Sequence, residues 1–167
     1  LQATCGAILL ATTFAASASA HADGVVRRQQ GAFPIATSVS IPPGAEIVFV
    51  SGTLADPVKP DAPAGSVERL GDTETQAASV LGKLAKALEA AGLGMGGVVK
   101  MNGFLVGDPA LGGRMDFDGM MRAYSKHFGT AAQKNLPART TVQVAALPLP
   151  GALVEIEVVA ARAPAAK

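Results

Sequence analysis

Two segments near the C-terminus constrain the fold more than any other feature of this sequence. Residues 135–146 (NLPARTTVQVAA) and residues 153–160 (LVEIEVVA) are rich in β-branched residues and alternate polar with apolar positions. Such alternation is typical of strands whose two faces meet different surroundings. Residues 147–151, which lie between them, contain two prolines and a glycine and are predicted to form a connector. The sequence therefore predicts a β-sheet that takes two strands from this region.

The alternation also predicts which side chains share a face of this sheet. In the first strand the two valines are predicted to face away from Thr141 and Gln143. In the second strand the valines and the isoleucine share one face, which leaves Glu155 and Glu157 on the opposite face. We expect a half-polar, half-apolar outer face that is suited to burial against another subunit. Its expected members are Thr141, Gln143, Ala145, Glu155, Glu157 and Val159.

Arg139 begins the first of these strands, directly after a turn that contains a proline. A guanidinium at this position can hold a carboxylate through paired, charge-assisted hydrogen bonds. A glutamate on a neighbouring strand could orient or deprotonate water. In a purely structural alternative, Arg139 pairs with Glu155 or Glu157 and holds two strands together.

The segments Pro-Ala-Arg139-Thr-Thr-Val-Gln-Val and Val-Glu155-Ile-Glu157 resemble the signature of the RidA (YjgF-type) enamine/imine deaminases. Further segments agree with this family in the same order, and the resemblance covers roughly residues 33–162. They are Val48-Phe-Val-Ser-Gly52, Gly71-Asp-Thr-Glu-Thr-Gln76 with the Leu/Ala-rich stretch after it, Val98–Val106, and Asp116-Phe117 with Tyr124 and Phe128.

The resemblance implies an α+β, chorismate-mutase-like fold: a single sheet with two helices on one face, assembled as a homotrimer with active sites between subunits. It implies hydrolysis of reactive 2-imino or enamine acids to 2-keto acids and ammonia, without a cofactor or metal. By the same resemblance Arg139 binds the substrate carboxylate, Glu155 positions the attacking water as the catalytic residue, and Ser51 lines the cleft. A non-catalytic carboxylate-binding module of the same fold is the alternative.

The chain departs from the family pattern at two positions that are expected to bind substrate. Ile35 follows Pro34 where many members have a tyrosine, and Met121 stands where an asparagine is common. The connector at residues 147–151 is also slightly longer. These differences predict a more apolar cleft with a different preference for the substrate side chain.

Composition limits the other possibilities. The chain has 167 residues, enough for one well-filled core, and a formal net charge of +1 with 16% charged residues. Without a basic stripe or any tryptophan, nucleic acid is not expected as a partner. The single cysteine, Cys5, and the two histidines do not form a pattern of zinc ligands.

The N-terminal segment differs from the rest in composition. Residues 1–22 are rich in Ala, Ser and Thr around a short apolar run and end in Ala20-His-Ala22, which is typical of a secretory signal and its cleavage site. The run is too short to span a bilayer. Cleavage before Asp23 would place the protein in the periplasm or outside the cell, and an uncleaved leader, docked as a helix, would leave it in the cytoplasm. Residues 23–32 are predicted to be a polar tether, 33–162 the folded domain and 163–167 a tail.

Within the domain the patterns predict the order β-β-α-β-α-β-β. An edge strand is expected at residues 36–41, a buried strand at 46–51, an exposed excursion at 56–71 and a strand at 98–106. Thr73 and Gln76 have the spacing of a capping box at the start of the first helix. The second helix is expected after Asp116.

Overall fold

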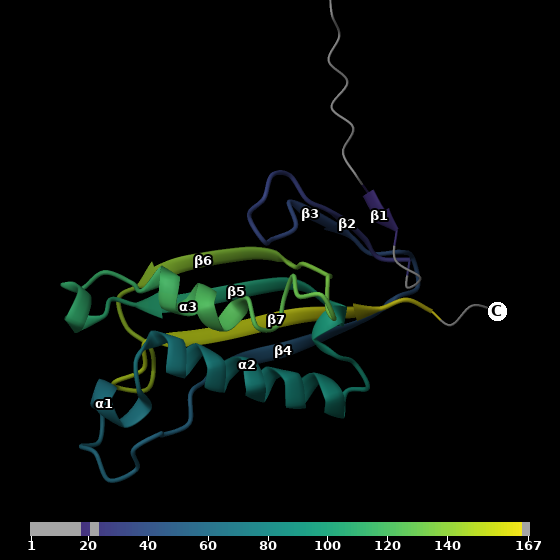
Figure 1. The fold of residues 1–167 in the computed structure, drawn as a ribbon. Helices are drawn as coiled ribbons and strands as arrows, with labels where there is room; N and C mark the ends of the chain where they lie inside the picture. The colour runs from purple at the N-terminus through teal and green to yellow at the C-terminus, as the bar shows by residue number, and fades with distance from the viewer. Residues whose placement is uncertain (1–17, 21–23, 165–167) are drawn as a thin grey trace, which may run out of the picture.

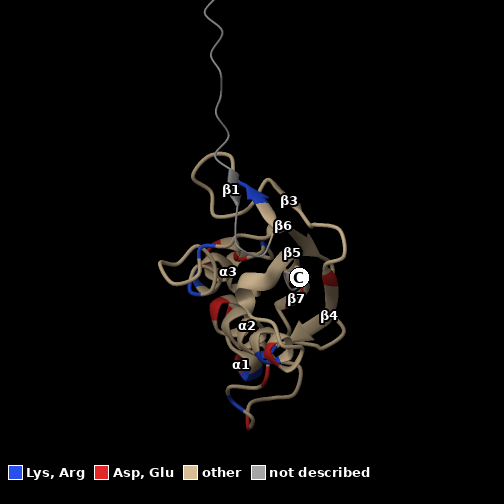
Figure 2. Cartoon of the chain, turned by 90° about the vertical axis from the view of Figure 1, so that its right-hand side faces the viewer, with Lys and Arg blue, Asp and Glu red and all other residues tan. Residues whose placement is uncertain are grey.

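The core of the protein is a four-stranded sheet covered on one face by two helices. The structure is a computed structural model that describes residues 18–20 and 24–164. The strand order is β4-β7-β5-β6, with β5 and β6 parallel and the other pairs antiparallel. Figures 1 and 2 show both long helices on the same side of this sheet, which confirms the predicted α+β architecture. The elements are β4 (Glu46–Leu54), α2 (Thr73–Ala90), β5 (Val98–Val106), α3 (Phe117–Tyr124), β6 (Ala138–Val144) and β7 (Val154–Arg162).

Each helix buries an apolar stripe of residues three and four positions apart. The leucines and Val80 of α2 and the Met120–Tyr124 side of α3 pack on the alternate, inward residues of β5 and β7. Burial of this apolar surface is the main favourable term that holds the helices to the sheet. Fully buried members include Val80, Leu81, Leu84, Leu88, Met101, Leu105, Met120, Ile156 and Ala160.

The start of α2 differs from the predicted capping box. The N-cap is Asp72, whose carboxylate accepts a hydrogen bond from the backbone N–H of Thr75. Gln76 does not accept a hydrogen bond from the N–H of the N-cap residue, as a capping box requires. Its side chain is fully buried, donates to the carbonyl groups of Gly71 and Gly151, and accepts from the N–H of Leu153. Gln76 therefore connects the start of α2 to the start of β7.

A second, small sheet lies beside the edge formed by β6. It has the order β1-β2-β3 and comprises β1 (Ala18–Ala20), β2 (Val26–Arg28) and β3 (Ser38–Ser40). The edge strand expected at residues 36–41 is thus divided. Ala36 forms an isolated parallel bridge with Ala138 of β6, and Ser38–Ser40 joins the small sheet.

The other predicted segments correspond to short elements or fall partly outside the structure. The excursion at residues 56–71 contains α1 (Val67–Leu70), and the turns η1 (Met95–Gly97) and η2 (Pro109–Leu111) precede and follow β5. Of the predicted leader, only Ala18–Ala20 lies among the described residues. No helix in the described part of the chain is both long and apolar enough to cross a membrane.

The strand predicted to be buried at residues 46–51 is instead an exposed edge. β4 pairs with β7 alone, and Phe49 and Ile47 are 79% and 47% exposed. The apolar run misled the prediction because its outward residues lie on the face of the sheet that carries no helix. We call this face the open face.

Two residues expected on the open face lie on the helix face. Thr141 and Gln143 pair in register with Gly103 and Leu105 of β5, and Leu105 is buried beneath the helices. Residues paired in register point to the same side of a sheet, so Thr141 and Gln143 point toward the helices. The strand's valines face the open side, where Val142 is 41% exposed. Glu155 and Glu157 do lie on the open face, as predicted.

Candidate functional site

The guanidinium of Arg139 is enclosed by aromatic rings. Its central carbon lies 4.4 Å from the ring centroid of Tyr124, 5.5 Å from that of Phe33 and 5.6 Å from that of Phe117. The two phenylalanine rings are themselves stacked, with centroids 6.3 Å apart. One terminal nitrogen, Nη1, is 3.0 Å from the sulfur of Met121. Ring faces attract cations, so this arrangement holds the guanidinium in a fixed orientation.

No described acidic side chain pairs with this guanidinium. Burial lowers the pKa of Arg139 from its ordinary value, while a guanidinium remains charged at neutral pH. Burial also raises the pKa of Tyr124 to about 12, so its hydroxyl is neutral at physiological pH. A half-buried cation without an acidic partner is suited to bind an anion.

Residues 33–36, which precede β3, form one wall of this site. The hydroxyl of Tyr124 donates a hydrogen bond of 2.8 Å to the carbonyl of Pro34, and the N–H of Ala36 donates to the carbonyl of Pro137. The segment that contains Ile35, which was expected to line the cleft, therefore lies beside Tyr124 and the start of β6. The ring that contacts the guanidinium belongs to Phe33.

A further polar group lies on the same face, two residues from Arg139. The hydroxyl of Thr141 is buried and has no hydrogen-bond partner. It lies below α3. Both this hydroxyl and the sulfur-bound methyl group of Met120 are close to Gly103. Such a hydroxyl can accept or donate a hydrogen bond if a ligand or water reaches it.

Glu155 lies on the open face, against a bulge in β4. The pairing of β4 with β7 shifts between Val50 and Thr53, and Glu155 packs its side chain over Gly52 there. A Cβ atom at position 52 would lie 3.0 Å from the carboxylate carbon of Glu155 and would overlap one of its oxygens. The glycine therefore makes room for the carboxylate.

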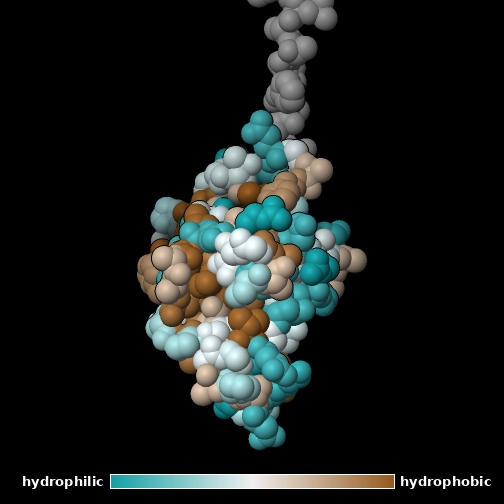
Figure 3. Space-filling view, turned by 90° about the vertical axis from the view of Figure 1, so that its left-hand side faces the viewer, coloured by the Kyte–Doolittle hydropathy of each residue, from teal (hydrophilic) through white to brown (hydrophobic). Residues whose placement is uncertain are grey.

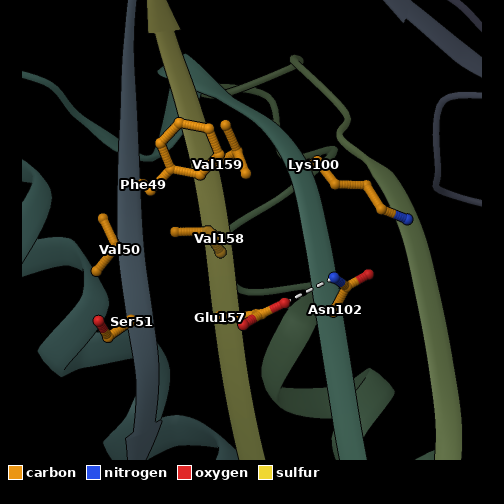
Figure 4. Close-up of a pocket in the computed structure, with 8 residues that line it drawn as sticks. All are labelled: Phe49, Val50, Ser51, Lys100, Asn102, Glu157, Val158 and Val159. Atoms are coloured by element: carbon orange, nitrogen blue, oxygen red, sulfur yellow. Dashed lines mark hydrogen bonds between the residues drawn. The ribbon is translucent and has the colours of Figure 1, made fainter.

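Ser51 lines a hollow of about 320 Å³ on the open face (Figure 4). Polar groups from β5 and β7 meet in this hollow, where Asn102 donates a hydrogen bond of 2.8 Å to Glu157. Its lining consists of Phe49, Val50, Ser51, Lys100, Asn102, Glu157, Val158 and Val159. The bonded Glu157 is held in a structural contact, whereas Glu155 has no such partner among the described side chains.

Arg139 and Glu155 lie on opposite faces of the sheet within one subunit. Arg139 is in register with Met101, which in turn pairs with Val158, and all three point toward the helices. Glu155 is an odd number of residues from Val158 and points the other way. In addition, β5 lies between β6 and β7, so the strands that were expected to be neighbours are not. The alternative in which Arg139 pairs with Glu155 or Glu157 is therefore wrong for this subunit.

The sequence predictions missed the aromatic enclosure of Arg139. Met121 was expected to bind substrate, but Phe117 and Tyr124 entered only as part of the family resemblance, and Phe33 only as the start of the domain. A signal was present: residues four and three apart in α3 share one face, and the parallel arrangement of β5 and β6 places α3 above β6.

The end of the molecule where β4, β5 and β6 finish is not uniformly polar. Figure 3 shows hydrophobic side chains gathered through the middle and along one flank of this end, interrupted by hydrophilic ones. Together, fold and site define an α+β subunit with an arginine enclosed by aromatic rings at the edge of its sheet and an uncovered, partly apolar face.

Comparison with known proteins identifies this class. The model of the family described as endoribonuclease L-PSP matches residues 38–162, and the chain belongs to this family, the YjgF/Rid family of its solved relatives. None of the curated proteins with which the chain was compared matches it.

Three solved structures illustrate the relationship. A protein of unknown function from Pseudomonas aeruginosa, PA3499, is 37% identical, with a TM-score of 0.55, over 69% of this chain and 74% of that one. Escherichia coli TdcF, solved with bound serine, is 30% identical, with a TM-score of 0.54, over 80% and 91% of the two chains. Rv2704 from Mycobacterium tuberculosis, a YjgF/YER057c/UK114 family member, is 26% identical, with a TM-score of 0.50, over 77% and 86%.

Proposed function

We propose that this protein hydrolyses reactive 2-imino and enamine acids to 2-keto acids and ammonia. The observation that carries the proposal is the half-buried Arg139 guanidinium, which is fixed by three aromatic rings and has no acidic partner among the described residues. Its free N–H groups match a carboxylate in a two-pronged geometry. The serine bound to the TdcF relative also carries a carboxylate, which supports a small amino-acid-derived ligand.

The chemistry requires an anchor and a directed water molecule. A protonated imine is already electrophilic, so water can add to its carbon once Glu155 orients the water and accepts one of its protons. Glu155 then returns that proton to the amino group of the tetrahedral adduct, the C–N bond breaks to release ammonia, and the hydroxyl group gives its proton to solvent as the carbonyl of the 2-keto acid forms. Holding the carboxylate on Arg139 fixes the reacting carbon relative to the water and so lowers the entropic part of the barrier.

A complete site needs two subunits on this proposal. Within one chain Arg139 and Glu155 face opposite ways, so the glutamate that serves Arg139 must come from a neighbouring copy. The open face supplies a suitable contact surface, because exposed Phe49 and Val142 lie there beside the hollow that Ser51 lines. We propose a homotrimer in which the open face of each subunit is covered by the others.

Two other functions remain in competition. A carboxylate-binding module without catalysis would use the same arginine and is favoured by the apolar Met121 next to the guanidinium. Endoribonuclease activity, which the description of the family names, is less well supported, since the net charge is +1 and no run of basic residues is longer than Arg27-Arg28.

A coupled assay tests the proposal directly. An amino-acid oxidase generates imines in solution, semicarbazide traps them, and the protein is added in increasing amounts. We expect the rate of imine loss to rise, and trapped product to fall, in proportion to the protein. If 2-keto acids bind but imine loss is never accelerated, the protein is a binding module and not a deaminase.

A further inference from the structure

The surroundings of Arg139 carry information about the side chain of the ligand. The stacked pair Phe33 and Phe117 lies beside the guanidinium, with ring centroids 5.5 and 5.6 Å from its central carbon, and Phe33 is 47% exposed. The substituent on the carbon next to a carboxylate bound by the guanidinium therefore comes to lie against ring surface. Covering exposed apolar surface with an apolar group is favourable.

Among the described side chains that touch the guanidinium, few polar groups could form a hydrogen bond with a hydroxyl or amide on this substituent. The hydroxyl of Tyr124 is already used by the carbonyl of Pro34. The sulfur of Met121 lies at Nη1 and is only a weak acceptor. The free hydroxyl of Thr141 is fully buried below α3, close to Gly103 and the sulfur-bound methyl group of Met120.

We propose that this site selects 2-imino and 2-keto acids with an apolar side chain, whether branched aliphatic, thioether or aromatic, over those with a polar side chain. The inference rests on the proposed function for the position of the carboxylate on Arg139. A polar substituent would lose its hydration without gaining a partner, whereas an apolar one of equal size would not. A preference of about tenfold or more is expected for a group the size of a leucine side chain.

The test uses two probes of nearly the same shape. The 2-keto acids 4-methyl-2-oxopentanoate and 2-oxosuccinamate differ in that an isobutyl group replaces an amide-bearing group. Their binding to the intact protein is measured by titration calorimetry, and the imines derived from leucine and asparagine are compared in the coupled assay. Wild type is expected to bind the first keto acid about tenfold more tightly or better.

Two variants assign the preference to the site. Phe33→Ala removes the exposed ring and should reduce the preference to below about threefold, mainly by weakening the apolar probe. Met121→Gln has a similar length but offers an amide, and should strengthen binding of 2-oxosuccinamate. Leu149→Ala, which truncates a side chain of similar exposure in the connector before β7, is the control and should change neither affinity.

The outcomes separate this inference from the proposed function. Equal affinity for the two probes, or tighter binding of the amide, overturns the inference. A preference that survives unchanged in both site variants also overturns it, because the selectivity then arises elsewhere. Selective binding without accelerated imine loss leaves the inference standing and removes the deaminase. Failure to bind either probe overturns both.

Discussion

An oxygen of the Glu155 carboxylate occupies the space into which a side chain at position 52 would project, so the carboxylate can take this position only because Gly52 has no Cβ. The atom that would be displaced is the far end of a flexible side chain and not backbone. A methyl group at this position should therefore move the carboxylate without breaking the sheet.

Gly52→Ala is expected to lower imine hydrolysis by about tenfold or more, because a displaced carboxylate orients water poorly. The midpoint of urea unfolding should change little. Gly82→Ala, in the middle of α2 where a Cβ meets nothing within 4 Å, is the matched control. It should keep full activity and gain about 0.5–1 kcal/mol of stability. Full activity in Gly52→Ala would remove Glu155 from the mechanism.

Substitutions at Arg139 and Glu155 should separate binding from catalysis. Arg139→Lys keeps the charge but loses the two-pronged geometry, so carboxylate affinity should fall by about 1.5–3 kcal/mol. Glu155→Gln keeps the shape but removes the base, so hydrolysis should fall by about 100-fold with ligand affinity nearly unchanged. Calorimetry and the coupled assay measure the two effects. A Glu155→Gln protein that loses only stability would make this glutamate a strand-pairing residue.

The open face predicts the state of assembly. Light scattering at micromolar concentration should give the mass of three chains of 16.7 kDa each. Phe49→Glu places a charge on the most exposed large apolar side chain of this face and should dissociate the assembly and abolish hydrolysis. Because Phe49 is 79% exposed in the single subunit, circular dichroism should show an intact fold. A stable, active wild-type monomer would contradict both the trimer and the shared site.

Removal of the buried amide of Gln76 is expected to cause a large loss of stability. Gln76→Ala leaves two carbonyl groups and one N–H without their bonds and should cost roughly 2–4 kcal/mol in the free energy of unfolding. Gln143→Ala also removes bonds to backbone groups, those of Gly113 and Met115, but at an exposed position. It should cost less than about 1 kcal/mol, since water replaces the lost bonds. Equal losses of unfolding free energy in Gln76→Ala and Gln143→Ala would show that the hydrogen bonds of Gln76 add no stability beyond its packing.

Stability should depend on pH through His127. Burial, assisted by the charge of Lys126, lowers its pKa below the ordinary 6.5. The unfolded chain therefore binds this proton more readily than the folded one, so stability is fully present above pH 6.5 and falls as the pH drops through the folded pKa. The melting temperature should decrease from about pH 7.5 to about pH 5.5, and less so in His127→Gln. Identical slopes for both proteins would exclude this histidine as the cause.

Much of the fold could be predicted because its periodicities are local. The apolar stripe of α2, the apolar face of α3 and the alternation of β7 each repeat within one element. Because buried positions are apolar, such repeats can be recognised in the sequence. Gly92, just after the end of α2, has the positive φ that is common for a glycine at a helix end. The outward residues of β4 were misjudged, because an apolar edge strand and a buried strand have similar sequences.

The arrangement of the site could not be predicted in the same way. Alternation fixes which residues of one strand share a face, but it does not fix how that face is turned relative to another strand. That depends on the order β7-β5-β6 and on the register between strands, which arise from contacts distant in the sequence. The choice of Arg139 and Glu155 therefore rests on the family resemblance, and the expectation that their strands are neighbours is wrong. The enclosing rings of Phe33 and Tyr124 come from segments 90 residues apart, joined by the hydrogen bond of Tyr124 to Pro34.

The separation of Arg139 from Glu155 by the thickness of the sheet has a genetic consequence on the proposed arrangement. A chain that has lost its arginine still lends an intact glutamate to its neighbour, and a chain that has lost its glutamate still offers an intact arginine. Two inactive proteins, dissociated and reassembled together, would thus regain part of the activity that neither has alone. In a cell that makes both chains, each chain would compensate for the defect of the other. The cell would then show activity although neither gene copy alone encodes an active protein.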